Sequence, residues 1–135
     1  MEFVTFEIAK KLKEKGYPQV KQNTLAMYDE VGDWCSLAKN LDDFEYLFED
    51  FDDKDCVCPT ISQVLEWLRE EHCLHFEVLS TVYGYRLSIC DTPDKGGTGR
   101  YFSHANDDGT NDCGAWDRYE ECVLYGIKYV LDNLI

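Results

Sequence analysis

The chain has 135 residues and a formal net charge of -14, and 44% of its residues are hydrophobic. This length suits one domain over residues 1–135, the apolar content argues against a disordered chain, and the negative charge argues against direct binding of nucleic acid or anionic membranes. No run approaches the roughly 18 consecutive apolar residues of a membrane span. Because the seven cysteines are odd in number and no export signal precedes them, we expect reduced thiols in a cytoplasmic protein.

The first predicted element is a helix that begins after Thr5, a residue type favoured at N-caps. Gly16 stands where helices commonly end with glycine. An apolar stripe between them has helical spacing: Ile8, Ala9 and Leu12. Residues 24–29 and 34–38 then predict two short strands, which are joined by a turn at 31–33.

Residues 39–58 are predicted to form an acidic, aromatic-rich loop within the domain. Eight carboxylates here are the candidate partner-binding residues: Asp42, Asp43, Glu45, Glu49, Asp50, Asp52, Asp53 and Asp55. Three interpretations stay open. The segment imitates the charge row of DNA, or it docks a basic protein with its aromatic side chains as anchors, or it is a solvated loop whose aromatics complete the core.

The second predicted helix begins after Thr60, which forms a T-x-x-Q capping box with Gln63, and it extends to about His72. The apolar period then changes from 3.6 to two. Alternation over 74–79 and 85–90, with a turn near Thr81–Gly84, predicts a hairpin with one buried face. A glycine-rich loop leads to a third strand at 100–103.

The last predicted helix carries an apolar stripe from Tyr119 to Leu134, and Asp117 with Glu120 forms a D-x-x-E capping pattern. Gly126 interrupts this stripe, and we expect it to let the helix lie close to a sheet. The order helix, one or two strands, helix, three-stranded meander, helix predicts an α+β fold, in which about three helices cover a mainly antiparallel sheet.

The spacing of several cysteines and histidines resembles that of a metal site: Cys56-x-Cys58 is followed by His72-Cys73-x-His75. The predicted helix between the two halves is roughly 18 Å long, whereas all zinc ligands lie within about 2.3 Å of the ion. We therefore predict no metal, and we interpret Cys58 and Cys73 as small apolar core residues.

Other candidate sites are weaker. Cys90 and His104 flank the glycine-rich loop and suggest a nucleophile with its base, although neither stands at a motif that would activate it. The 91–99 loop has the wrong spacing for a phosphate loop. The 106–112 loop suits a solvated turn, and a loose calcium site there stays open. We predict no catalytic residue and no cofactor.

Three stretches carry a resemblance: Thr5–Leu12, Cys58–Glu71 and Tyr119–Leu134. On these residues the chain resembles a group of short, acidic, uncharacterised proteins of bacterial genomes and prophages. The resemblance covers most of the chain and implies no activity, cofactor or catalytic residue. Its prophage association favours the mimic and inhibitor interpretations.

The sequence thus predicts a non-enzymatic protein that binds a basic or nucleic-acid-binding protein through its acidic surface. One form of this hypothesis is that the protein acts as a nucleic-acid mimic or inhibitor. The alternative is a small-ligand binder or enzyme with a site near the 91–99 and 104–116 loops, where Tyr101 and Trp116 would line a pocket. The sequence does not set the oligomeric state.

Overall fold

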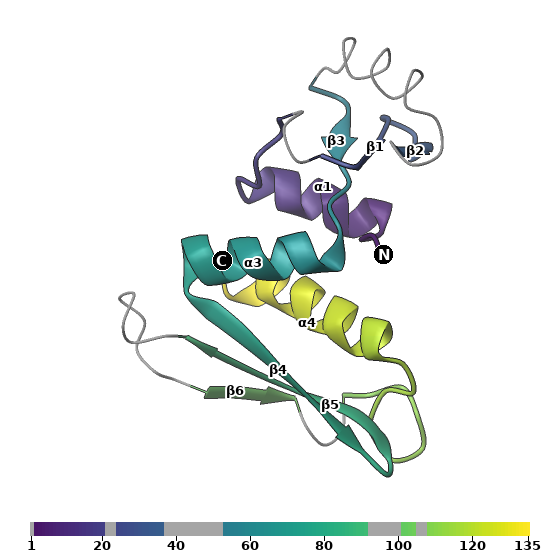
Figure 1. The fold of residues 1–135 in the computed structure, drawn as a ribbon, viewed down its shortest axis with the longest axis vertical. Helices are drawn as coiled ribbons and strands as arrows, with labels where there is room; N and C mark the ends of the chain where they lie inside the picture. The colour runs from purple at the N-terminus through teal and green to yellow at the C-terminus, as the bar shows by residue number, and fades with distance from the viewer. Residues whose placement is uncertain (1, 21–23, 37–52, 92–100, 105–107) are drawn as a thin grey trace. The chain divides into compact units, whose positions relative to one another are not determined.

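The computed structural model describes residues 2–20, 24–36, 53–91, 101–104 and 108–135 of the chain (Figure 1). These residues form three helices and two small antiparallel sheets, which confirms the predicted α+β class. The expectation of one sheet is wrong, because the strands before residue 60 pair only among themselves. The chain divides into two compact units, Met1–Thr60 and Ile61–Ile135. The single domain over residues 1–135 stays a prediction.

The first unit combines α1 (Phe6–Glu14) with three short strands, β1 (Ala26–Tyr28), β2 (Trp34–Ser36) and β3 (Cys56–Val57). β1 is the central strand and pairs antiparallel with both neighbours. β3 was not predicted, because a two-residue strand shows no periodicity. The hydroxyl of Tyr28 donates a hydrogen bond to the Val4 carbonyl at 2.9 Å, which ties β1 to the chain that enters α1.

Both predicted ends of α1 are confirmed. The Thr5 Oγ1 accepts a hydrogen bond from the backbone N–H of Ile8 at 3.3 Å. Gly16 follows the C-cap residue Lys15 and has a φ of 94°, a conformation that glycine adopts without a steric cost. The predicted apolar stripe of Ile8, Ala9 and Leu12 is buried.

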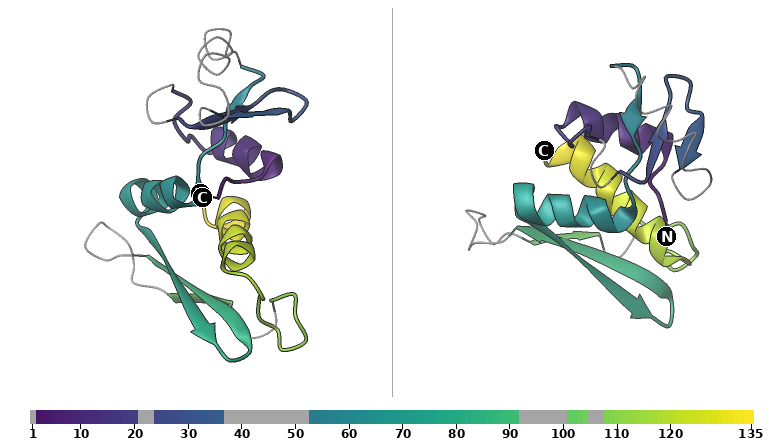
Figure 2. Two further views of the ribbon diagram at one scale, coloured as in Figure 1. Left: turned by 45° about the vertical axis from the view of Figure 1, so that its right-hand side comes forward. Right: turned by 45° about the horizontal axis from the view of Figure 1, so that its top comes forward.

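The second unit contains α3 (Ile61–His72), β4 (Leu74–Thr81), β5 (Gly84–Asp91), β6 (Tyr101–His104) and α4 (Tyr119–Asn133). Its sheet has the order β4-β5-β6 with antiparallel neighbours. Both helices lie on the same side of this sheet (Figures 1 and 2). The core of the unit is formed where they meet it, by Val64, Leu68, Leu74, Leu87, Ile89, Val123, Ile127 and Leu131.

α3 begins directly after Thr60 and ends at His72, as the sequence predicted. The predicted Asp117 cap of α4 is wrong, because the N-cap residue is Arg118, whose side chain makes no cap hydrogen bond. The Asp117 carboxylate instead accepts a hydrogen bond from the Asn111 amide at 3.1 Å. Among the described residues, no helix combines the length and the apolar character that crossing a membrane requires.

Candidate partner-binding surface

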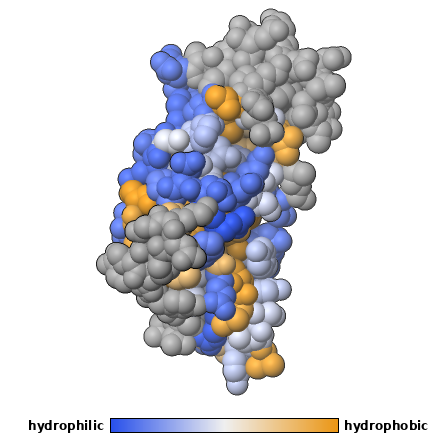
Figure 3. Space-filling view, turned by 60° about the vertical axis from the view of Figure 1, so that its left-hand side comes forward, coloured by the Kyte–Doolittle hydropathy of each residue, from blue (hydrophilic) through white to orange (hydrophobic). Residues whose placement is uncertain are grey.

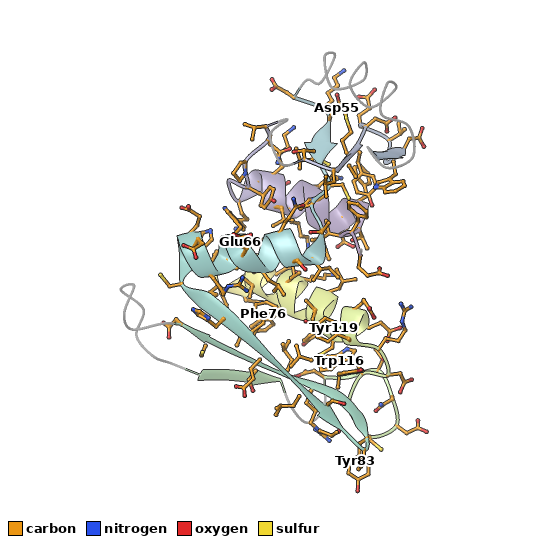
Figure 4. The ribbon with its side chains drawn as sticks, in the orientation of Figure 1. Asp55, Glu66, Phe76, Tyr83, Trp116 and Tyr119 are labelled. Atoms are coloured by element: carbon orange, nitrogen blue, oxygen red, sulfur yellow. The ribbon has the colours of Figure 1, made fainter. Side chains whose placement is uncertain are left out.

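The structure describes only the C-terminal end of the acidic segment, residues 53–55. Asp53 and Asp55 lie just before β3 (Figure 4), and the Asp53 residue is exposed. The other six candidate carboxylates lie outside the described residues: Asp42, Asp43, Glu45, Glu49, Asp50 and Asp52. The Lys13 ammonium of α1 donates hydrogen bonds to the main-chain carbonyl of Asp53 and, at 2.7 Å, to that of Asp55. The end of the segment is thus held through its backbone.

The β4–β5 turn presents large apolar side chains to solvent. Val82 is 93% exposed, Tyr83 59% and Leu79 51%. We call these three residues the hairpin-tip patch. In the space-filling view an apolar spot lies at the lower end of the second unit, where the ribbon view places this turn (Figures 1 and 3). Tyr83 projects from the end of the hairpin (Figure 4).

The turn itself is ordered by local hydrogen bonds. The Thr81 hydroxyl accepts a hydrogen bond from the Tyr83 N–H at 3.2 Å and donates one to the Gly84 carbonyl at 2.7 Å. Gly84 has a φ of 122°, and a Cβ there would lie 2.6 Å from the Trp116 carbonyl oxygen. Glycine is therefore required at this position, both for its φ and for the close approach of the chain.

Asn111 joins the loop before α4 to the turn. Its amide nitrogen donates hydrogen bonds to the Tyr83 carbonyl at 2.9 Å and to Asp117 at 3.1 Å. Its amide oxygen accepts from the N–H groups of Cys113 and Ala115, both at 2.9 Å. Because this oxygen already accepts two hydrogen bonds, the structure gives Asn111 a structural role in the loop where the sequence left a calcium site open.

Trp116 closes the loop against β5. It exchanges two backbone hydrogen bonds with Tyr85, at 2.7 and 3.1 Å, and its ring packs at a tilt of 41° against Tyr125 of α4, with 4.9 Å between centroids. Trp116 is only 2% exposed. The ring is thus packed in the core against α4 (Figure 4). Residues 92–100 and 105–107 of the alternative ligand site lie outside the described residues, so that site stays a prediction.

Carboxylates are frequent in the loop that contacts the hairpin turn and in the first turn of α4. Five acidic residues and one arginine lie between residues 108 and 121. Asp108, Asp112, Asp117 and Glu121 are exposed, and Arg118 forms an ion pair with Glu120 at 3.7 Å. Burial, and after it the nearby Asp108 carboxylate, raises the pKa of Tyr125. An apolar tip beside a negative surface is therefore the surface that the described residues offer.

The sequence analysis missed the hairpin-tip patch although a signal was present. The turn at 81–84 reads T-V-Y-G, with a valine and a tyrosine in its centre. Turn centres usually carry glycine, proline, asparagine or aspartate, because these residues favour the required backbone angles. Two large apolar residues in such a place are therefore not explained by turn formation.

The suggested nucleophile pair is not brought together. Cys90 pairs with Tyr101 and His104 pairs with Leu87, so the register separates the two by three residues, about 10 Å along the sheet. On the adjacent strand β4, the residue that pairs with Cys90 is His75. No three His, Cys, Asp or Glu side chains in the described part of the chain are placed to hold a metal ion.

The cysteines that were interpreted as core residues are free thiols. Cys56 and Cys58 are buried, while Cys73 is partly exposed. Burial raises the pKa of Cys58 to about 11 and that of Cys122 to about 11, so both thiols stay protonated at neutral pH. A protonated thiol is a poor nucleophile and a poor metal ligand.

Comparisons of the chain with protein-family models, with curated proteins and with solved structures find no match. The resemblance to short acidic proteins of bacterial genomes and prophages therefore stays a prediction.

Proposed function

We propose that this protein acts by binding a basic protein partner, with the hairpin-tip patch as the apolar anchor. The observation that carries the proposal is the exposure of Val82 and Tyr83 at a turn that Thr81, Asn111 and Trp116 hold in place. Anchors on a backbone that is already held in place bind with a smaller loss of conformational entropy. Burial of each such side chain contributes about 1.5–3 kcal/mol.

The negative charge selects the partner. A net charge of -14 repels acidic proteins and nucleic acid, and it accelerates encounter with a basic surface. The exposed carboxylates near the tip support the same choice. We therefore propose a partner with an apolar pocket ringed by lysine or arginine side chains. The acidic segment of residues 42–55 belongs to this proposal as a second contact or as a mimic of DNA charge.

The test is affinity capture from host lysate with matched variants. The wild type, the double variant Val82→Ser/Tyr83→Ser and the control Val31→Ser are tagged and compared after washes at low and high salt. Val31 is a suitable control because it is 72% exposed at a turn in the other unit. We expect one partner that both the wild type and Val31→Ser retain, while the double variant binds at least about 100-fold more weakly.

Equal retention by all three proteins would remove the hairpin tip from the proposal, and retention of no partner by any of them would overturn it. If duplex DNA displaces the captured partner, the acidic surface acts by mimicry. If DNA does not compete and the complex resists high salt, apolar docking dominates.

A further inference from the structure

Among the strands that the structure describes, β4 is a long edge strand that is paired on one side only. Its eight residues, Leu74–Thr81, form an unbroken register with β5, and the sheet order β4-β5-β6 leaves the other side of β4 without a partner among the described strands. In Figure 1 this strand leads from the end of α3 to the hairpin turn.

The direction of the free backbone groups follows from Tyr85. This residue exchanges both of its backbone hydrogen bonds with Trp116, on the side of β5 that faces away from β4. Hydrogen-bonded and non-bonded pairs alternate along an antiparallel ladder. Ser80, the partner of Tyr85, is thus a non-bonded position, and the N–H and C=O groups of Phe76, Val78 and Ser80 point outward from the edge.

Within its own residues, β4 carries little of the usual protection of an edge strand. Natural sheets block their edges with proline, lysine, bulges or short strands. β4 contains no proline and no glycine, its register has no bulge, and Glu77 is its single carboxylate or ammonium side chain. Leu79, a member of the hairpin-tip patch, is half exposed on the face of the strand opposite the helices. Such an edge is a ready template for one more strand.

We propose that the β4 edge binds an extended, basic segment of the partner as an added antiparallel strand. This inference rests on the proposed function and names its binding mode. Cross-strand pairs would place a lysine or arginine opposite Glu77 and an aliphatic side chain opposite Leu79. Charge favours this occupant over a second copy of the chain, since a copy brings another net charge of -14 to the edge.

The experiment uses amide hydrogen exchange of the full chain with two synthetic peptides as probes. One is the capped peptide Lys-Thr-Val-Thr-Lys-Thr-Lys, in which the valine and the next lysine are two residues apart, as Leu79 and Glu77 are, and the other replaces every lysine with glutamate. In the free protein we expect slow exchange at Glu77 and Leu79, whose N–H groups bond to β5, and fast exchange at the three outward amides. The lysine peptide slows exchange at Phe76, Val78 and Ser80, and the glutamate peptide does not.

A pair of variants tests the backbone contact directly. Ser80→Pro removes one outward N–H at an exposed edge position, where proline is tolerated, and Ser80→Ala keeps that N–H. We expect the lysine peptide to bind Ser80→Pro about tenfold more weakly than Ser80→Ala. If Ser80→Pro does not fold, the exchange pattern of the wild type decides the question without it.

The outcomes separate the two proposals. If the lysine peptide binds but leaves the three outward amides unprotected, the edge proposal is wrong while the proposed function stands. If neither peptide binds, charge-selected strand addition is wrong and only the lysate capture bears on the function. If the outward amides become protected in the free protein as its concentration rises, a second copy occupies the edge, and the basic segment is excluded.

Discussion

Gly126 of α4 lies directly against Phe76 of β4. A Cβ at Gly126 would lie 2.7 Å from Cε2 of Phe76 and 2.6 Å from Cδ2 of Leu87, closer than carbon atoms approach without repulsion. The prediction that this glycine lets the helix approach the sheet is confirmed. The helix thereby gives up the roughly 1 kcal/mol that alanine would add within it.

We predict that Gly126→Ala lowers the free energy of unfolding by about 1 kcal/mol, because overpacking costs about 1–3 kcal/mol and the helix regains about 1 kcal/mol. Urea denaturation of the two proteins measures the difference. In a double-mutant cycle, adding Phe76→Leu should recover part of the loss, since the shorter side chain gives the methyl group room. A gain of about 1 kcal/mol for Gly126→Ala alone, the value for a free helix, would contradict this packing.

Asn111 holds the hairpin tip, so its removal should loosen the tip more than it destabilises the fold. We predict that Asn111→Ala costs about 1–2 kcal/mol and speeds amide exchange at Cys113 and Ala115, whose N–H groups bond to the Asn111 oxygen. Asn111→Asp keeps that acceptor but loses the donor to Tyr83 and sets a carboxylate beside Asp117. Unchanged exchange in both variants would show that the loop does not depend on this amide.

Cys73 joins α3 to β4 with a φ of 58°. Left-handed backbone costs a residue with a side chain about 1–2 kcal/mol, and glycine avoids this cost but loses about 0.5–1 kcal/mol in chain entropy. We predict that Cys73→Gly raises the stability by about 0.5–1 kcal/mol. Cys73→Ala is the matched control, because it removes the thiol and keeps the strain. A lower midpoint for the glycine variant than for the alanine variant would refute the prediction.

Stability should fall at alkaline pH through two buried thiols. Burial raises the pKa values of Cys58 and Cys122 to about 11 from an ordinary value of 9.0. Between these values the unfolded chain loses protons that the folded chain retains, so the contribution is complete below pH 9 and is lost as the pH rises toward 11. We expect a loss on the order of 1–2 kcal/mol per thiol.

Urea midpoints at pH 8, 9, 10 and 11 under reducing conditions measure this effect. The double variant Cys58→Ala/Cys122→Ala should lose less stability over the same interval than the wild type. Tyr28, whose pKa is also raised by burial, acts in the same direction in both proteins. Parallel curves for the two proteins would show that these thiols are not the groups that titrate.

The helix ends could be predicted from the sequence, because helix capping depends on residues that are adjacent in the chain. The cap at Thr5, the end of α1 at Gly16 and the start of α3 after Thr60 each depend on a few adjacent side chains. Two features escaped because distant residues decide them. β3 exists through its pairing with β1, and Asp117 precedes the N-cap Arg118 and accepts a hydrogen bond from Asn111 instead.

The candidate site was harder to predict than the fold. Exposure of Val82 and Tyr83 depends on the course of the chain around them, and the pairing of Tyr85 with Trp116 joins residues 31 positions apart. The sequence directed attention to charge, which is visible in composition. The ordered apolar tip and the outward amides of β4 become visible only when the strand register is known.

Lys13 holds the end of the acidic segment through hydrogen bonds that do not involve the carboxylates of the segment. The lysine binds main-chain oxygens at Asp53 and Asp55, and every amino acid supplies the same oxygen at those positions. Substitutions at Asp53 and Asp55 therefore leave the acceptors of the Lys13 hydrogen bonds in place. If acidic residues persist at these two positions while the sequence diverges elsewhere, selection acts on the carboxylates themselves and not on this contact.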